Sequence, residues 1–135
     1  MQGFRRVIVI TNSHIRIVKV SAEIEKDEYE FKVSHWRLLL ETNRYYEIKP
    51  ENGPVKRIFK EKLNTIVDET KSYTDGFLAC SAFCDEERID EMQSEILKNL
   101  QLKINVYMNE LQLNQKAIDQ QYLCPKTGVL RGSQA

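Results

Sequence analysis

The sequence predicts an α+β fold in which an antiparallel sheet comes first and a long helix comes last. Two observations carry this prediction. Short runs of β-branched and aromatic residues, separated by turn residues, fill the first 50 positions, as is typical of strands. Residues 85–121 contain neither Gly nor Pro and repeat apolar residues at helical spacing. We expect about four antiparallel strands, one amphipathic helix, one further strand and the long C-terminal helix. Residues 1–124 would form a single domain and 125–135 a C-terminal tail.

The first two strands are expected to form a hairpin. Residues 7–11 are a short β-branched run that predicts a well-buried strand, and Asn12-Ser13 is a turn signal. Residues 15–20 then predict the second strand.

Two more strands complete the expected meander. Residues 29–35 alternate in polarity and lead into the apolar residues 38–40, which together predict the third strand. Residues 41–44 form a turn signal, and residues 45–48 predict the fourth strand.

Pro50 to Pro54 marks a hard break, after which the period changes. An amphipathic helix of about four turns is predicted, with Pro54 in its first turn. Its apolar positions are Val55, Ile58, Phe59, Leu63, Ile66 and Val67. Residues 77–83 are small, apolar and aromatic, and predict a strand that is buried on both faces or one whose backbone is closely approached by another group.

The long helix is expected to begin at Asp85, which is a good N-cap and is followed by acidic residues that the helix dipole favours. A straight helix over residues 85–121 would be about 55 Å long, whereas a domain of this size is about 35–40 Å across. The helix should therefore break or find a partner. Apolar residues also alternate at period two over residues 100–108, so a strand is an alternative to the helix there. The helix would then break near residues 101–105.

The C-terminal half of this helix carries residues at alternating steps of four and three, as in a coiled-coil seam with one polar member. We expect this seam to pack on a second copy of the chain. Its members are Leu100, Ile104, Tyr107, Leu111, Asn114 and Ile118.

Composition narrows the classes of function. Lys plus Arg equals Asp plus Glu, 20 each, so the net charge is zero, which argues against a binder of duplex nucleic acid. No segment approaches the roughly 18 apolar residues of a membrane span. The three cysteines are an odd number, which favours free thiols in a reducing, cytoplasmic environment. No ligand pattern indicates a metal site, and no cofactor is expected.

The sequence contains none of the glycine-rich phosphate loops or nucleophile motifs of common enzymes. We therefore expect no enzymatic activity, although a hidden site around His35 and the cysteines is a third alternative. Arginines interleaved with aromatic residues point instead to binding, because guanidinium groups take phosphate and planar rings stack on bases. The aromatics could also be ordinary core residues. The candidate ligand-binding residues are Arg37, Arg44, Tyr45, Lys56, Arg57, Phe77 and Phe83.

Four segments of the chain resemble segments of a known protein family. They are residues 7–15 (VIVITNSHI), residues 35–38 (HWRL), Glu41-Thr42 and residues 45–48 (YYEI). Together with the order of sheet, basic helix, apolar strand and long helix, residues 4–120 resemble the first type of phage Thoeris anti-defence protein. This resemblance implies a homo-oligomer that holds a cyclic ADP-ribose signal between subunits, without cleaving it, in the host cytoplasm. Some members similarly hold cyclic oligonucleotides elsewhere.

We therefore expect a protein that sequesters a small cyclic nucleotide. The alternative is a protein–protein interaction module or inhibitor that acts through its long helix.

Overall fold

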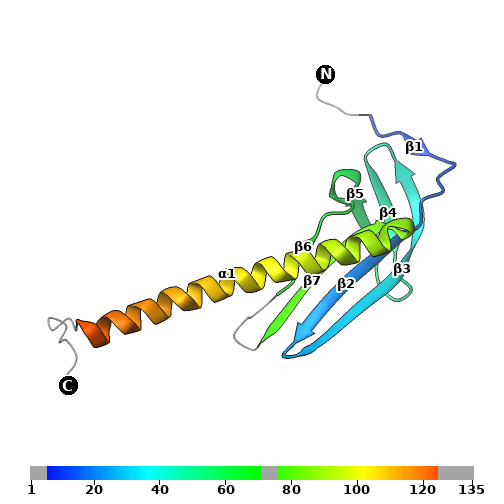
Figure 1. Ribbon diagram of the computed structural model, residues 1–135. Helices are drawn as coiled ribbons and strands as arrows, with labels where there is room; N and C mark the ends of the chain where they lie inside the picture. Colours follow the sequence, from blue (N-terminus) through cyan, green and yellow to red (C-terminus); the bar gives the residue numbers. More distant parts are fainter. Residues whose placement is uncertain (1–5, 71–75, 125–135) are drawn as a thin grey trace. The chain divides into compact units, whose positions relative to one another are not determined.

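The computed structural model describes residues 6–70 and 76–124, and the chain separates into two compact units. The first unit, Met1–Leu100, holds all the strands, and the second, Gln101–Ala135, holds the later part of the one long helix (Figure 1). The α+β class is confirmed. The predicted single domain of residues 1–124 extends over both units. The predicted tail, residues 125–135, lies outside the described residues.

Within residues 6–70 and 76–124, the sheet has seven strands, and every pairing between them is antiparallel. Six of them lie in the order β5-β4-β3-β2-β7-β6, while β1 pairs with the end of β3. The strands are β1 (Val9–Ile10), β2 (Ile17–Glu25), β3 (Glu28–Thr42), β4 (Tyr45–Lys49), β5 (Lys56–Phe59), β6 (Val67–Asp68) and β7 (Phe77–Asp85).

The centre of the sheet is a β2–β3–β4 meander, as the turn signals predicted. Lys26 takes the left-handed conformation in the turn between β2 and β3, with φ of 58°. At the turn between β3 and β4, the Thr42 hydroxyl accepts hydrogen bonds from the Arg44 and Tyr45 backbone N–H groups. These local bonds reverse the chain within two residues, so β3 and β4 pair directly.

The predicted N-terminal hairpin is wrong. Strand β1 is only two residues long and pairs with Glu41 and Thr42 of β3 rather than with β2. Both edges of β2 are already taken by β3 and β7, so β2 has no place for the N-terminal run. Asn43 instead holds this run through hydrogen bonds with the Ile8 backbone, and its four apolar residues, Val7 to Ile10, are 37–54% exposed.

The predicted amphipathic helix over residues 55–67 is also wrong. The segment forms strand β5, a single 3₁₀ turn at Lys60–Lys62 (η1) and the short strand β6. Ile58 is buried, whereas Val55, Phe59 and Val67 are exposed, so the apolar positions do not share one buried face. The edge of β4 offers backbone partners to residues 56–59, and this sheet pairing outweighs a helical pattern of modest propensity.

Helix α1 (Ile89–Leu123) confirms the predicted long helix and runs without interruption through residues 101–105. The alternative strand near residues 100–108 is therefore wrong. A 3₁₀ turn at Glu86–Arg88 (η3) precedes α1, and the Asp85 carboxylate accepts a hydrogen bond from the Glu87 N–H at 3.1 Å. This is the expected cap of a helix start.

The first three turns of α1 cover one face of the sheet, which we call the outer face. Met92, Ile96 and Leu100 are buried on the helix side. Alternate residues of β2 and β7 are buried beneath them, and Gln93 reaches the Tyr29 hydroxyl of β3. The buried strand residues are Val18, Val20, Ala22, Leu78, Cys80, Ala82 and Cys84.

The opposite face, which we call the inner face, carries a second core. Its buried residues are Ile17, Tyr46, Ile48 and Ile58, packed with Ile15, Trp36, Leu38, Leu63 and Phe83. Strands from both halves of the sheet contribute to this cluster. The sheet therefore curls around its inner face, which leaves a hollow between the β5 end and the β6–β7 end.

Candidate ligand-binding site

A hollow of about 440 Å³ lies on the inner face of the sheet, and we call it the inner pocket. Its volume is within the range of small-molecule sites. Its walls come from strands β2, β5, β6 and β7 and from the segment after β5. The lining residues are Lys19, Lys56, Arg57, Ile58, Phe59, Lys62, Thr65, Val67, Glu69, Ser81 and Phe83.

The segment that follows β5 closes one wall of the inner pocket. The Asn64 N–H donates to the Phe83 carbonyl at 2.7 Å, which ties this segment to β7. Asn64 adopts a φ of 67°, a conformation that Asn tolerates better than most residues. This turn places Lys62 and Thr65 beside the pocket.

Positive charge exceeds negative charge in the inner pocket. Lys19, Lys56 and Lys62 line it, Arg57 borders it, and among the described lining residues Glu69 is the one acid. The Glu69 carboxylate accepts a hydrogen bond from the Ser81 hydroxyl at 2.9 Å and lies 4.0 Å from the Lys19 ammonium.

Two of these cations carry the excess. Within residues 6–70 and 76–124, neither Lys56 nor Lys62 has a side-chain hydrogen bond or ion pair. Their ammonium groups are therefore available to an anion that enters the pocket.

Arg57 borders the same pocket, but its side chain lies on the face of β5 opposite Ile58, beside Glu47 and Tyr45. It donates to the Glu47 carboxylate at 3.0 Å and lies 4.0 Å from the centroid of the Tyr45 ring. Tyr45 also makes an edge contact with Phe59, at 5.6 Å between ring centroids. The Arg57 guanidinium is therefore held on the other face of β5, and Lys56 and Lys62 remain as the cations available to a ligand phosphate.

The apolar wall of the pocket is built around Phe83. Its ring meets the Trp36 ring edge-on, with centroids 5.0 Å apart, and the Lys19 ammonium lies 5.8 Å from its centroid. Phe59 and Val67 add exposed apolar surface at the rim. The pocket thus combines an apolar wall with two lysines that have no side-chain partner in the described residues, a combination suited to a ligand with a flat organic part and anionic groups.

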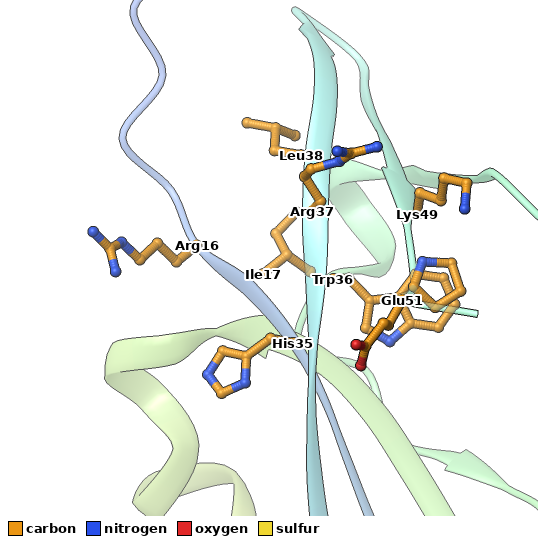
Figure 2. Close-up of a pocket in the computed structure, with 9 residues that line it drawn as sticks. Arg16, Ile17, His35, Trp36, Arg37, Leu38, Lys49 and Glu51 are labelled. Atoms are coloured by element: carbon orange, nitrogen blue, oxygen red, sulfur yellow. The ribbon is translucent and has the colours of Figure 1, made fainter. Parts of the chain in front are cut away.

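A second hollow of about 610 Å³ lies where β2, β3 and β4 meet. It includes the predicted residue Arg37, together with the basic residues Arg16 and Lys49. Figure 2 shows that these three cationic groups point in different directions and do not converge on one position. Glu51 lines the same hollow and lowers its net positive charge. The inner pocket is therefore the better candidate.

The structure places the predicted ligand-binding residues in different parts of the fold. Lys56, Arg57 and Phe83 come together in the inner pocket. Arg37 lines the second hollow. Arg44 and Tyr45 lie at the β3–β4 turn, outside both hollows. Phe77 lies at the far end of β7, beside a shallow hollow that contains Asp68 and Thr70.

Sequence reasoning missed Lys19, Lys62, Thr65, Glu69 and Ser81 as pocket residues. Lys19 offered a usable signal, because it is a lysine between two buried valines of a central strand. Its side chain must then point to the face opposite those valines. The segment that follows β5 brings Lys62, Thr65 and Glu69 to the pocket, and β7 brings Ser81. No local sequence pattern indicates that these residues would meet.

The alternative site around His35 and the cysteines lies on the outer face. His35 and Cys84 both lie opposite Val18, on either side of β2, and the His35 ring contacts the Glu86 carboxylate at 3.2 Å. Burial, with a smaller contribution from Asp85, raises the pKa of the Cys84 thiol to about 11. Cys84 is therefore a protonated structural thiol rather than an activated nucleophile. Of the remaining cysteines, Cys80 is buried and Cys124 is exposed.

One buried ion pair supports the β3–β5 side of the sheet. The Lys60 ammonium donates to the Glu41 carboxylate at 2.6 Å, and it lies 5.2 Å from the Tyr46 ring centroid. Burial alone would raise the pKa of Glu41, but hydrogen bonds from Lys60 and Ser13 outweigh it and lower the pKa below its usual value. Burial raises the pKa of the Tyr46 phenol beside this pair.

Among the described residues, no group of three or more His, Cys, Asp and Glu side chains is placed to hold a metal ion. In the same part of the chain, no helix combines the length and apolarity needed to cross a bilayer. No family model matches the sequence, and neither a curated protein nor a solved structure matches the chain.

Proposed function

We propose that the protein binds a small phosphorylated nucleotide in its inner pocket and holds it without cleaving it. The observation that carries this proposal is the surplus of positive charge around a partly apolar hollow. Lys56 and Lys62 face no acidic partner in the described residues, while Phe83 and Phe59 supply apolar surface. Charged hydrogen bonds to phosphate and contacts with a flat base use these two features together.

Size and overall charge support a small ligand over a polymer. A hollow of about 440 Å³ suits a molecule the size of a nucleotide or a cyclic dinucleotide. A surface for duplex nucleic acid would call for a basic stripe, whereas this chain has a net charge of zero. The ligand would therefore be recognised by a local cluster of cations rather than by the field of the whole protein.

The lining of the pocket favours retention over reaction. The one acid among its described lining residues, Glu69, is held by Ser81 and Lys19, so the carboxylate is not poised as a free base. The segments that resemble phage Thoeris anti-defence proteins, residues 7–15, 35–38 and 45–48, suggest a cyclic ADP-ribose-like signal or a cyclic oligonucleotide as the ligand, although the basic helix of that resemblance is absent from residues 55–67. Binding would then keep the signal from its receptor, in the cytoplasm of the infected host.

Calorimetry with cyclic ADP-ribose isomers and cyclic oligonucleotides tests this function. We expect saturable heat with at least one of them, and intact ligand after the complex is denatured and its contents are analysed by mass spectrometry. Recovery of a cleaved product would instead show an enzyme. The absence of heat with all of these ligands would refute the proposal.

A second function, assembly through α1, is favoured by the exposed apolar residues of the unit that begins at Gln101. Within this part of the helix, large apolar side chains remain exposed on the single chain. They are Leu102, Val106, Met108, Leu111, Leu113, Ile118, Tyr122 and Leu123. We propose that part of this surface packs on a second copy of the helix.

The structure changes the membership of the predicted seam. Leu100 is 1% exposed because it packs within the first unit, so it is not available to a partner. Leu97 is exposed instead and continues a seven-residue repeat with Ile104, Leu111 and Ile118. Such a repeat is the pattern of a coiled-coil position. Light scattering at micromolar concentration tests the assembly: a mass near 15.9 kDa would show a monomer and would refute it.

A further inference from the structure

The first nine residues of β3 have a neighbouring strand on one side only. β2 pairs with residues 28–36, whereas β4 begins its pairing at Arg37. In the part of the chain that the structure describes, no other strand pairs with residues 28–36, and this half of β3 lies at the rim of the sheet (Figure 1). Every second residue of an edge strand directs its N–H and C=O groups outward, where another strand can pair with them.

The side chains of this edge separate into an apolar face and a charged face. Tyr29, Phe31 and Val33 lie on the outer face of the sheet, and Tyr29 and Val33 are exposed. Glu30 and Lys32 lie on the inner face, where their charged groups are 3.7 Å apart. Natural edge strands use charges to prevent pairing, so the sign and order of these charges decide what the edge can accept.

The edge is complementary to itself in one register. If two copies pair antiparallel with Phe31 opposite Phe31, Glu30 of each copy faces Lys32 of the other, and Tyr29 faces Val33. A centre moved to Glu30 or to Lys32 places like charges directly opposite each other. Cross-strand pairs of opposite charge and of apolar residues stabilise a sheet, and like charges destabilise it.

We propose that this edge binds the same edge of a second copy of the chain, antiparallel about Phe31, so that the two sheets become continuous. A two-fold contact of this kind is isologous, since the same patch serves both subunits. This register requires a partner strand with charges in the complementary order. A second copy of the chain has that order because its sequence is the same, whereas an unrelated peptide need not have it. This interface is separate from the helix seam and from the inner pocket.

Charge reversal tests the register. Glu30→Lys alone and Lys32→Glu alone each create two like-charge pairs across the interface, so each variant should weaken the edge contact by about tenfold or more. An equimolar mixture of the two variants restores both opposite-charge pairs and should associate as a heterodimer. The double variant Glu30→Lys/Lys32→Glu should again pair with itself. Sedimentation velocity of each variant, of the mixture and of the parent protein measures these outcomes.

Disulfide trapping tests the same register independently of the helix. In a Cys124→Ser background, only the buried Cys80 and Cys84 remain. Phe31→Cys should form a disulfide-linked dimer under mild oxidation, because the two substituted positions face each other. Val33→Cys is the matched control on the same face of the strand, and it should not crosslink with itself. A mixture of Tyr29→Cys and Val33→Cys should crosslink.

The proposal is overturned if both single charge variants associate as the parent does, or if their mixture gains nothing. It is equally overturned if Phe31→Cys and Val33→Cys crosslink at the same rate. Binding of an unrelated extended peptide at this edge, with no self-pairing, would assign the edge to another partner. Circular dichroism of each variant separates loss of pairing from loss of fold, and the double variant preserves the test if a single variant unfolds.

Discussion

Removal of the two unpaired pocket lysines should abolish most ligand binding with almost no effect on folding. Lys56 and Lys62 line the inner pocket, and neither has a side-chain partner in the described residues. A hydrogen bond to a charged group contributes about 1.5–3 kcal/mol. The Lys56→Ala/Lys62→Ala variant should therefore lose about 3 kcal/mol of binding free energy at the lower limit, which is roughly a 100-fold rise in Kd.

The effect of the double variant on folding should be small, because neither lysine has a side-chain partner in the described residues. Surface substitutions that break no specific contact change the free energy of unfolding by about 0.5 kcal/mol or less. Isothermal calorimetry with cyclic ADP-ribose isomers measures the first effect, and urea denaturation measures the second. Lys49→Ala is the matched control, because Lys49 is a lysine of the second hollow. Unchanged affinity in the double variant, with lost affinity in Lys49→Ala, would refute the assignment and move the ligand to the second hollow.

Four further outcomes are expected. Leu111→Asp should dissociate a helix-mediated assembly, because Leu111 is 60% exposed on the single chain and a charge is unfavourable in an apolar seam. Light scattering measures the mass, and an unchanged mass would show that this residue lies outside the interface. Ile96→Ala should lower the free energy of unfolding by about 2–5 kcal/mol in urea titrations, since the side chain is fully buried between helix and sheet. Arg57→Ala should lower it by only about 1 kcal/mol, because its half-exposed ion pair and its ring contact are each weak. Native protein at pH 8 should react with a maleimide at Cys124 and not at Cys84, as mass spectrometry can show. Because the pKa of Cys84 is raised from 9.0 to about 11, its contribution to stability is complete below pH 9 and falls as the pH rises toward 11.

The long helix and the strands with clear local signals could be predicted from the sequence. Residues 89–123 contain no helix breaker, and Asp85 caps the start, so short-range interactions suffice to specify the helix. The turn at Thr42 to Tyr45 and the apolar strand β7 follow in the same way from side chains close in the chain.

The errors lie where backbone partners distant in the sequence decided the structure. Residues 55–67 matched a helical period, but the open edge of β4 decided for a strand at Lys56–Phe59. Residues 7–11 looked like a buried strand, but β2 had no free edge to accept them. In both cases the available backbone partners, which are distant in sequence, determined the outcome.

The sequence by itself determined that an antiparallel sheet is followed by a long helix, and it identified Lys56, Arg57 and Phe83 among the candidate binding residues. Only the tertiary structure brought these three together with Lys19 and Lys62, and engaged the guanidinium of Arg57 with Glu47. The physical reason is the range of the interactions concerned. Helix caps and turns depend on neighbours within a few residues, whereas the inner pocket depends on the curl of the sheet and on which edges remained free to pair.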